Sequence, residues 1–556
     1  RYGTPMDLAA DIGRYLDDKP VTARPASFGY RAGKYVRRNR TAVALASLTF
    51  AALMAGITGT VIQAQRARVQ RDFAFRELAR AEAVNDLNDY VLSDAASVEK
   101  TFTVDDLLAG AERIVQRQQE GQGTRAELLL SLGRQYATLG KYQKARQLLE
   151  EARDLSRKVS EPSTLARASC ELGQVLSRTG DVGQGEASFQ EGLKGIPEDP
   201  LYVVDRVTCL LRGAEVAVTA GHENDALGRA RAAQHLVEQS SFQSDSLKVV
   251  SLIVLALASN STGQRGEAVE DYQKAATLLE SLGRDQTSLA GTTFNNWGTM
   301  LNRAGRPLEA ERVLRRTIEI ARQGPGEVSV PLTTLANYGQ ALYELRRLDE
   351  ADRACEQVYE RAKKAGDSIA FSQTLLHRAR IYRAQGNLAQ ADAMLAEVEP
   401  LLQKSVPPGH IAFAILAFDK ALNAQARGDN VKAMTLARQT TDMMGALAKK
   451  GRASADYQGK ALVGISGIEL QAGNTEEALS DAAQALPLLQ KAALPGKYSA
   501  DVGHAYLAQG RALEAQGKNE EARAVFHLAA DNLGDALGQD HPDYLAARQL
   551  AHKAPQ

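Results

Sequence analysis

The sequence predicts an all-α protein in which about ten helix pairs stack into a solenoid that follows a single apolar helix. Three observations support this prediction. Helix-forming residues such as Ala, Leu, Arg, Gln and Glu dominate, and only 16 prolines interrupt the 556 residues. One short turn recurs ten times, at intervals of 40–45 residues. A stretch of 25 residues near the start of the chain carries no charge.

The first 40 residues contain one predicted helix and a basic linker. Residues 1–18 have the spacing of an amphipathic helix with a preceding turn, and Pro20 and Pro25 end it. Residues 19–40 form a linker whose side chains are mostly basic or small. The chain begins with Arg1 rather than Met, and we expect it to be part of a longer protein.

Residues 41–63 are expected to cross a membrane. About 20 consecutive apolar residues suffice for a transmembrane helix, and the charge-free stretch is longer than that. Six basic residues precede it within residues 21–40 and five follow it within residues 64–83, so charge does not decide its orientation. Ala52, Gly56 and Thr60 form a row of small residues that could pair two such helices in a homodimer.

Residues 64–120 are expected to be a helical connector, in which Thr103 caps a helix that begins before Asp105 and Asp106. Residues 121–556 form the predicted solenoid. Its repeated turn is marked in nine cases by glycine, which suits the left-handed position after a helix. The turn positions are Gly140, Gly180, Gly221, Gly263, Gly305, Arg346, Gly386, Gly428, Gly473 and Gly517.

Small residues recur in phase with these turns. Five residues after the turn stands alanine in every repeat but the second, which has Gly185. Seven residues before the turn the residue is always Gly, Ala or Ser. Two helices joined by a short turn can approach closely only where the crossing residues are small, so each turn is expected to join an antiparallel pair. Such pairs must stack to bury their apolar faces.

The segments from Asn295 to Ala321 and from Leu335 to Val358 resemble the longer tetratricopeptide repeats found in kinesin light chains. The resemblance covers residues 125–550 and implies a concave surface that binds extended or helical peptides. HEAT and armadillo arrays share the period and are the alternative. In the longer tetratricopeptide units an asparagine nine residues before the turn commonly faces the groove. The matching positions, which we predict to contact peptide, are Asn296, Asn337, His377 and Asp419. The last two depart from the asparagine pattern. Trp297 is expected to pack against a neighbouring helix rather than bind a partner.

The amino-terminal segment resembles a second family. The sequence RYGTPMDLAADIGRYLDDKPVTARP, followed by GYRAGKYVRRNR and the charge-free stretch, is similar to the junction in bacterial eukaryotic-like Ser/Thr protein kinases. There the last helix of the kinase C-lobe precedes a basic segment, one membrane helix and often tetratricopeptide repeats. The resemblance implies that residues 1–18 end a kinase domain, that the amino-terminal part is cytoplasmic and that the solenoid is extracytoplasmic.

Chemistry within this chain is not expected. It has no glycine-rich phosphate loop, HRD or DFG motif, HExxH or GxSxG sequence. ATP and magnesium are therefore expected only for a kinase domain outside it, and no cofactor or metal within it. Cys170, Cys209 and Cys355 lie far apart, and we expect them to pack as unpaired side chains. Equal numbers of acidic and basic residues, 67 each, argue against nucleic-acid binding.

Two functions from different classes fit the sequence. The first is the protein-binding scaffold or sensor region of a membrane-anchored Ser/Thr protein kinase. The second is a membrane-anchored adaptor without a kinase, which organises a protein complex. The sequence does not identify the partner.

Overall fold

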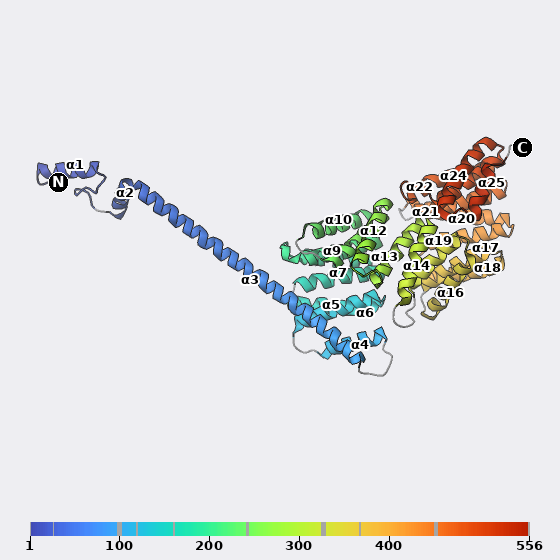
Figure 1. Cartoon of the computed structure of the whole chain (residues 1–556), viewed down its shortest axis with the longest axis horizontal. Coiled ribbons are helices and arrows are strands. Elements are labelled where there is room, and N and C mark those ends of the chain that lie inside the picture. The colour runs from blue at the N-terminus through green and yellow to red at the C-terminus, as the bar shows by residue number, and fades with distance from the viewer. Residues whose placement is uncertain are drawn as a thin grey trace. The chain divides into compact units, whose positions relative to one another are not determined.

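The computed structural model describes residues 2–25, 27–96, 103–117, 121–159, 162–240, 244–323, 330–365, 368–449 and 454–553. These residues form α-helices and one short 3-10 helix, and none of them forms a strand (Figure 1). The chain divides into two units, Arg1–Leu132 and Gly133–Gln556. The predicted all-α solenoid is confirmed.

The first unit contains α1 (Pro5–Leu16), α2 (Phe28–Arg38), α3 (Arg40–Ala96), α4 (Val104–Arg117) and most of α5 (Gln122–Thr138). Thr4 caps α1, since its hydroxyl accepts the N–H of Asp7 and its own N–H donates to the Asp7 carboxylate at 2.9 Å. The buried Asp11 accepts the backbone N–H groups of Thr22 and Ala23 at 2.8 and 2.9 Å. These hydrogen bonds, led by that of Thr22, lower the pKa of Asp11 to about 2. They tie the linker back onto α1.

The long helix α3 includes the predicted membrane segment. Within it, Arg40–Ser93 contains a window that is long and apolar enough to cross a membrane, and the side chains of that window are exposed. Thr103 caps α4 as predicted, because its hydroxyl accepts the N–H of Asp106 at 3.2 Å. Residues 97–102 and 118–120 of the predicted connector lie outside the described residues.

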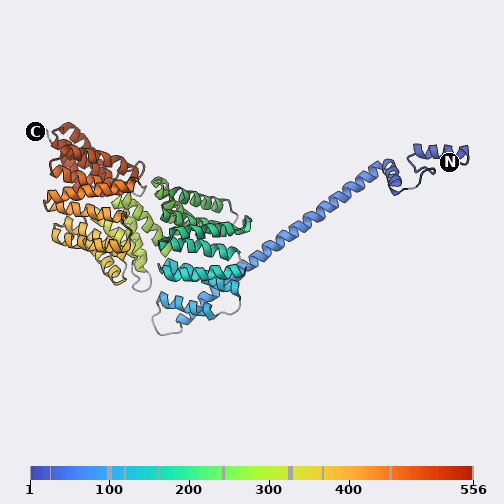
Figure 2. The ribbon, with the colours of Figure 1, turned by 180° about the vertical axis from the view of Figure 1, so that it is seen from behind.

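The second unit is built from antiparallel helix pairs in series (Figure 2). Its helices are α6 (Tyr142–Lys158), α7 (Pro162–Arg178), α8 (Val182–Gly195), α9 (Val203–Ala220), α10 (Glu223–Gln239), α11 (Asp245–Ser261), α12 (Arg265–Ser281), α13 (Ser288–Arg303), α14 (Pro307–Gln323), α15 (Leu332–Glu344), α16 (Leu348–Ala365), α17 (Ser368–Ala384), α18 (Leu388–Ser405), α19 (Ile411–Ala426), α20 (Asn430–Lys449), α21 (Ala455–Gln471), α22 (Thr475–Ala492), α23 (Ala500–Ala515), α24 (Asn519–Leu537) and α25 (Pro542–Ala551). The 3-10 helix Pro200–Tyr202 precedes α9. Each of these helices contacts the next one along the chain.

All ten predicted turns adopt the left-handed conformation. The nine glycines have φ between 70° and 98°, and Arg346 has φ of 58°. In each turn the following residue donates its N–H to the carbonyl five residues earlier, as Lys141 does to Tyr136 at 2.9 Å. This is the Schellman arrangement, which satisfies a carbonyl at the end of one helix while the next helix begins. The regular turn therefore fixes the antiparallel pair.

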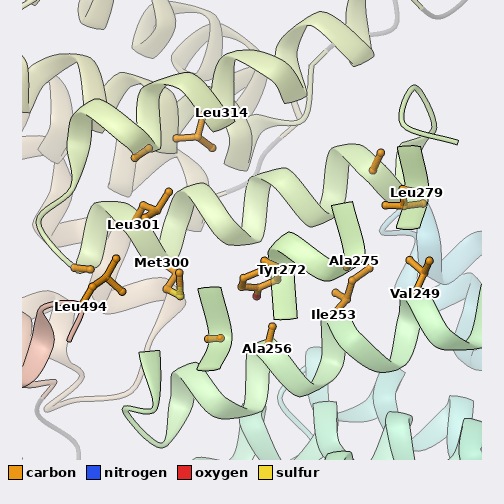
Figure 3. Packing of buried hydrophobic residues seen from close by; sticks show 14 of the residues in the cluster. Val249, Ile253, Ala256, Tyr272, Ala275, Leu279, Met300, Leu301, Leu314 and Leu494 are labelled. Carbon is orange, nitrogen blue, oxygen red and sulfur yellow. The ribbon is translucent and has the colours of Figure 1, made fainter. Parts of the chain in front are cut away.

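The small residues lie where paired helices cross. The nine alanines five residues after the turn are at most 1% exposed. A Cβ added to Gly298 would lie 2.5 Å from Leu314 Cγ, and one added to Gly510 would lie 2.4 Å from Phe526 Cε1. Large apolar residues fill the space on either side of the crossings, and Figure 3 shows Tyr272, Met300, Leu301 and Leu314 in one such cluster. Trp297 packs against the same cluster, as predicted.

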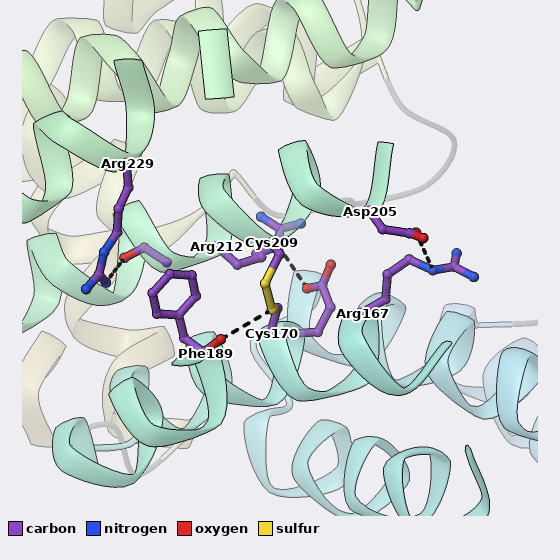
Figure 4. Close-up of a disulfide and its surroundings, with 9 residues drawn as sticks. Arg167, Cys170, Phe189, Asp205, Cys209, Arg212 and Arg229 are labelled. Carbon is purple, nitrogen blue, oxygen red and sulfur yellow. Dashed lines mark hydrogen bonds and ion pairs between the residues drawn. A yellow bond between two sulfur atoms is a disulfide. The ribbon is translucent and has the colours of Figure 1, made fainter. Parts of the chain in front are cut away.

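The prediction that all three cysteines are unpaired is wrong for two of them. Cys170 on α7 and Cys209 on α9 form a disulfide, with their Cα atoms 5.3 Å apart, and Cys355 is free and buried (Figure 4). The two cysteines are 39 residues apart, which is close to one repeat, and α7 and α9 contact each other. Cysteines one repeat apart on neighbouring first helices come within disulfide range.

Candidate functional site

The first helices of successive pairs line a cavity in the second unit. Helices α15, α17, α19, α21 and α23 each contact the next in this series. They supply most of the lining of an open cavity of about 530 Å³. Its apolar lining residues, here called the apolar wall, include Phe418, Leu422, Val463, Leu470 and Leu507. Its charged lining residues, here called the charged wall, include Arg303, Arg380, Arg383, Asp419, Asp456, Lys460, Asp501, His504, Arg511 and Asp543.

Ion pairs between neighbouring repeats organise the charged wall. Asp419 on α19 is only 1% exposed and receives two hydrogen bonds from Arg380 Nε, at 2.9 and 3.0 Å. Arg383 Nη1 lies 3.5 Å from the same carboxylate. Burial acts against the charge of Arg380, but the Asp419 carboxylate outweighs it and raises the pKa of Arg380. The Arg380 guanidinium therefore stays charged at the cavity wall, and Asp419 holds both guanidinium groups in place.

A second group of charged side chains comes from helices later in the chain. Lys460 Nζ lies 3.1 Å from Asp501, and His504 Nε2 lies 3.1 Å from Asp543. Burial raises the pKa of Asp501. Burial alone would lower the pKa of His504, but the hydrogen bond and charge of Asp543 raise it overall. The wall thus combines charges of both signs, most of which are paired with one another.

Contacts between distant repeats bound the cavity. Arg303 at the end of α13 binds Asp456 through two hydrogen bonds, of 3.0 and 3.1 Å, and donates to Ser454 Oγ at 2.6 Å. Nearby, the N–H of Ala500 donates to the Gly305 carbonyl at 2.8 Å. In Figures 1 and 2 the yellow-green α14 runs beside the orange and red carboxyl-terminal helices, and α14 contacts α24.

Apolar and backbone contacts reinforce this junction. Leu494 joins the core cluster that contains Met300 and Leu301 (Figure 3). Ser499 Oγ donates to the Ala304 carbonyl at 3.0 Å. A Cβ on Gly305 would lie 2.2 Å from Ser499 Oγ, so glycine at this turn allows both the left-handed backbone and the close approach. The carboxyl-terminal repeats are thereby held against the middle of the array.

Of the four predicted peptide-contacting residues, only Asp419 is among the residues that line the cavity. Asn296 is half-buried, and its side-chain oxygen lies 3.5 Å from Asn295 Nδ2. Asn337 Nδ2 donates to Thr299 Oγ1 at 2.7 Å and to Asn295 Oδ1 at 3.2 Å. His377 Nδ1 is buried without a hydrogen-bond partner, and burial, with Arg380 adding to it, lowers the pKa of His377 to about 4. A peptide contact at these residues stays a prediction.

We expect Asn337→Ala to destabilise the protein modestly. The substitution removes two neutral hydrogen bonds between neighbouring repeats, each worth about 0.5–1.5 kcal/mol. Asn296→Ala, which removes one weak contact at 3.5 Å, is the matched control and should unfold close to the parent. Denaturant unfolding followed by circular dichroism measures both. Equal stability of the two variants would contradict a bridging role for Asn337.

No group of three or more His, Cys, Asp or Glu side chains is placed to hold a metal ion in the part of the chain that the structure describes. The candidate site is the cavity formed by the first helices of stacked pairs, and its lining contains both apolar and charged side chains. The turns, the crossings and this arrangement define a tetratricopeptide-repeat solenoid.

Comparison with family models gives the same class. The model of the MalT-like TPR region matches residues 211–537, which is more than half of the chain. The chain belongs to this family. A second model, the tetratricopeptide repeat, matches residues 124–196. No curated protein matches the sequence.

Solved structures with similar repeats include three from different organisms. The human IFIT1 dimer with m7Gppp-AAAA is 17% identical, with a TM-score of 0.40 over 73% of this chain and 94% of that one. Yeast Tom70 is 12% identical, with a TM-score of 0.35 over 85% and 95%. A tetratricopeptide repeat protein from Parabacteroides merdae is 15% identical, with a TM-score of 0.34 over 55% and 99%. At these TM-scores the similarities carry no argument about ligands.

Proposed function

We propose that this chain is the protein-binding region of a membrane-anchored Ser/Thr protein kinase and that the solenoid cavity holds a segment of a partner protein. The cavity is the observation that carries the binding part of this proposal. Its volume, about 530 Å³, suits a short segment rather than a folded domain. Its apolar wall can bury a partner side chain, and its charged wall can hydrogen-bond a partner backbone.

The anchoring part of the proposal is supported by α3. The charge-free stretch of α3 begins at Thr41, and the order of segments resembles the junction in bacterial eukaryotic-like Ser/Thr protein kinases. We propose that residues 41–63 cross the membrane, with the amino-terminal part in the cytoplasm and the solenoid outside it. The Cys170–Cys209 disulfide supports this orientation, because disulfides persist mainly in oxidising compartments. A shallow groove on α3 at Ala52, Gly56 and Thr60 would let two such helices pair in a homodimer.

The kinase part of the proposal rests on the resemblance of residues 1–40. The exposed apolar side chains of α1, among them Met6, Ile12 and Leu16, are consistent with a helix that packs on another domain. A membrane-anchored adaptor without a kinase is the alternative. The upstream coding sequence separates the two functions, since a kinase requires a lysine on a strand, an HRD-type loop and a DFG motif. An upstream sequence without them would leave the adaptor.

A bulky side chain at Gly467 should block the cavity. Gly467 on α21 lines it, and a Cβ there would meet only Gln425 Nε2, at 3.7 Å. The Cβ of phenylalanine therefore fits at this position, and we expect its ring to project into the cavity. Gly228→Phe on α10 is the matched control, because a Cβ at Gly228 meets nothing within 4 Å and the residue lies outside the cavity.

A photo-reactive amino acid at Gln340, which also lines the cavity, is expected to cross-link the partner in the native membrane. Gly467→Phe should abolish this cross-link while helicity and melting stay unchanged, and Gly228→Phe should retain it. Equal cross-linking by both variants would remove the cavity as the binding site. Asn296→Ala combined with Asn337→Ala would then test the predicted contacts at those two residues, with the stability of Asn337→Ala alone as the reference.

A further inference from the structure

Helix α2 has one exposed apolar face. Phe28, Ala32, Tyr35 and Val36 occupy positions i, i+4, i+7 and i+8 and therefore lie on one side of the helix. Phe28 is 89% exposed, Tyr35 57% and Val36 44%. Large apolar side chains that are exposed to this extent on a short helix indicate a surface that is covered by another apolar surface.

The opposite side of α2 is fixed against the preceding segment. Lys34 is buried, and its Nζ donates to Asp18 Oδ1 at 2.8 Å and to the Tyr15 carbonyl at 3.2 Å. The hydroxyl of Tyr30 accepts the N–H of Val21 at 3.4 Å. These contacts occupy the side that carries Tyr30 and Lys34, and they leave the apolar face directed away from α1.

Basic side chains border one edge of the apolar face. Arg31 and Arg38 are exposed and lie beside Tyr35 on the helix surface, and α2 contains no acidic residue. Arg37 is also exposed, on the side of the helix opposite to the apolar face. Arg40, at the start of α3, follows after Asn39. Clusters of Lys and Arg beside a membrane segment attract anionic lipid headgroups, and amphipathic helices of this composition lie in the plane of the membrane surface.

The place of α2 in the chain determines which surface it can reach. The helix ends at Arg38, and only Asn39 separates it from α3. The charge-free stretch begins at Thr41. At 1.5 Å per residue α2 is about 16 Å long, so all of it lies close to the point where the chain would enter the bilayer.

We propose that α2 lies on the bilayer, with Phe28, Tyr35 and Val36 inserted among the lipids and Arg31 and Arg38 bound to anionic headgroups. This rests on the proposed membrane crossing of α3. The contacts of Lys34 and Tyr30 then hold α1 on the aqueous side of α2, at the membrane surface. The bilayer thus fixes the orientation of whatever domain α1 belongs to.

The test uses the full chain reconstituted in vesicles of phosphatidylcholine, with or without phosphatidylglycerol. Single spin labels replace Phe28, Tyr35 or Arg37 as Phe28→Cys, Tyr35→Cys and Arg37→Cys, and a fourth at Leu53→Cys reports the membrane crossing. Collision rates with oxygen, which enriches in lipid, and with a water-soluble nickel chelate measure the surroundings of each label. We expect oxygen to dominate at positions 28, 35 and 53 in vesicles with phosphatidylglycerol, and the chelate to dominate at position 37.

Replacing Arg31 and Arg38 by Gln together should remove the effect of phosphatidylglycerol at positions 28 and 35 and leave position 53 unchanged. Chelate access at 28 and 35 in both lipids, with position 53 still in lipid, would overturn the inference and leave the membrane crossing intact. Chelate access at position 53 would overturn both. Equal access at positions 28 and 37 would show that the helix has no membrane-facing side.

Discussion

Reducing the Cys170–Cys209 disulfide is expected to destabilise the solenoid by about 2–4 kcal/mol. The bond closes a loop of 39 residues between α7 and α9, and its loss returns conformational freedom to the unfolded chain. The surroundings are closely packed, with Phe189 stacked under the Arg229 guanidinium at 4.3 Å (Figure 4). Denaturant unfolding with and without a phosphine reductant measures the change.

The control is the double variant Cys170→Ala and Cys209→Ala. It lacks the bond, so its stability should not respond to reductant, although the parent's should. Cys355 is 1% exposed and is present in both proteins. Any difference between their responses to reductant therefore comes from the Cys170–Cys209 pair. A parent whose unfolding is indifferent to reductant would contradict the disulfide and would also remove its support for an extracytoplasmic solenoid.

Replacing Ala391 by leucine is expected to destabilise the protein by about 1–3 kcal/mol, because added methylenes overfill a closely packed crossing. Ala391 on α18 is fully buried in a cluster with Leu375, Ala379 and Leu395. It occupies the position five residues after the turn, as Ala310 does on α14, and Ala310→Leu should behave alike. Thermal melting followed by circular dichroism measures the loss.

Ala393→Leu is the matched control, since residue 393 lies on the same helix and is exposed. Leucine and alanine are both good helix formers, so this variant should stay within about 0.5 kcal/mol of the parent. If Ala391→Leu and Ala393→Leu melted together, the assignment of the crossing positions would be wrong.

The repeat was predictable because its signals are local and are repeated ten times. A left-handed turn favours glycine, and a close crossing requires a small residue, so both leave their mark at every repeat. Arg346 departs from the glycine pattern, yet its φ of 58° shows that the position and not the residue type is constant. Agreement among ten repeats compensates for one unsuitable residue.

The cavity was only partly predictable. Asp419 was found because its offset from the turn matches the groove position of related repeats. Its partner Arg380 stands 39 residues earlier, and opposite charges one repeat apart are a signal that could have revealed the pair. The disulfide carries the same kind of signal, since its cysteines are also separated by 39 residues.

The junction between distant repeats left no such mark in the sequence. Arg303 and Asp456 are 153 residues apart, and nothing in the local pattern of either residue indicates the other. Their contact depends on the curvature that accumulates from small rotations between successive pairs. A repeat motif specifies each step of this rotation only approximately, so the sequence alone could not predict where the array meets itself.

In an ordinary linear array each repeat senses only its neighbours, so unfolding can begin at either end and move inward one pair at a time. Here Ser499 binds the backbone of Ala304, 195 residues earlier in the chain, and Arg306 binds the Tyr498 carbonyl at 2.8 Å. Opening the last repeats therefore also breaks contacts in the fifth repeat. The helix pairs between them are expected to unfold more cooperatively than in a linear array. Forming these contacts requires the closure of a long loop, which raises the contact order and slows folding relative to a linear array of equal length.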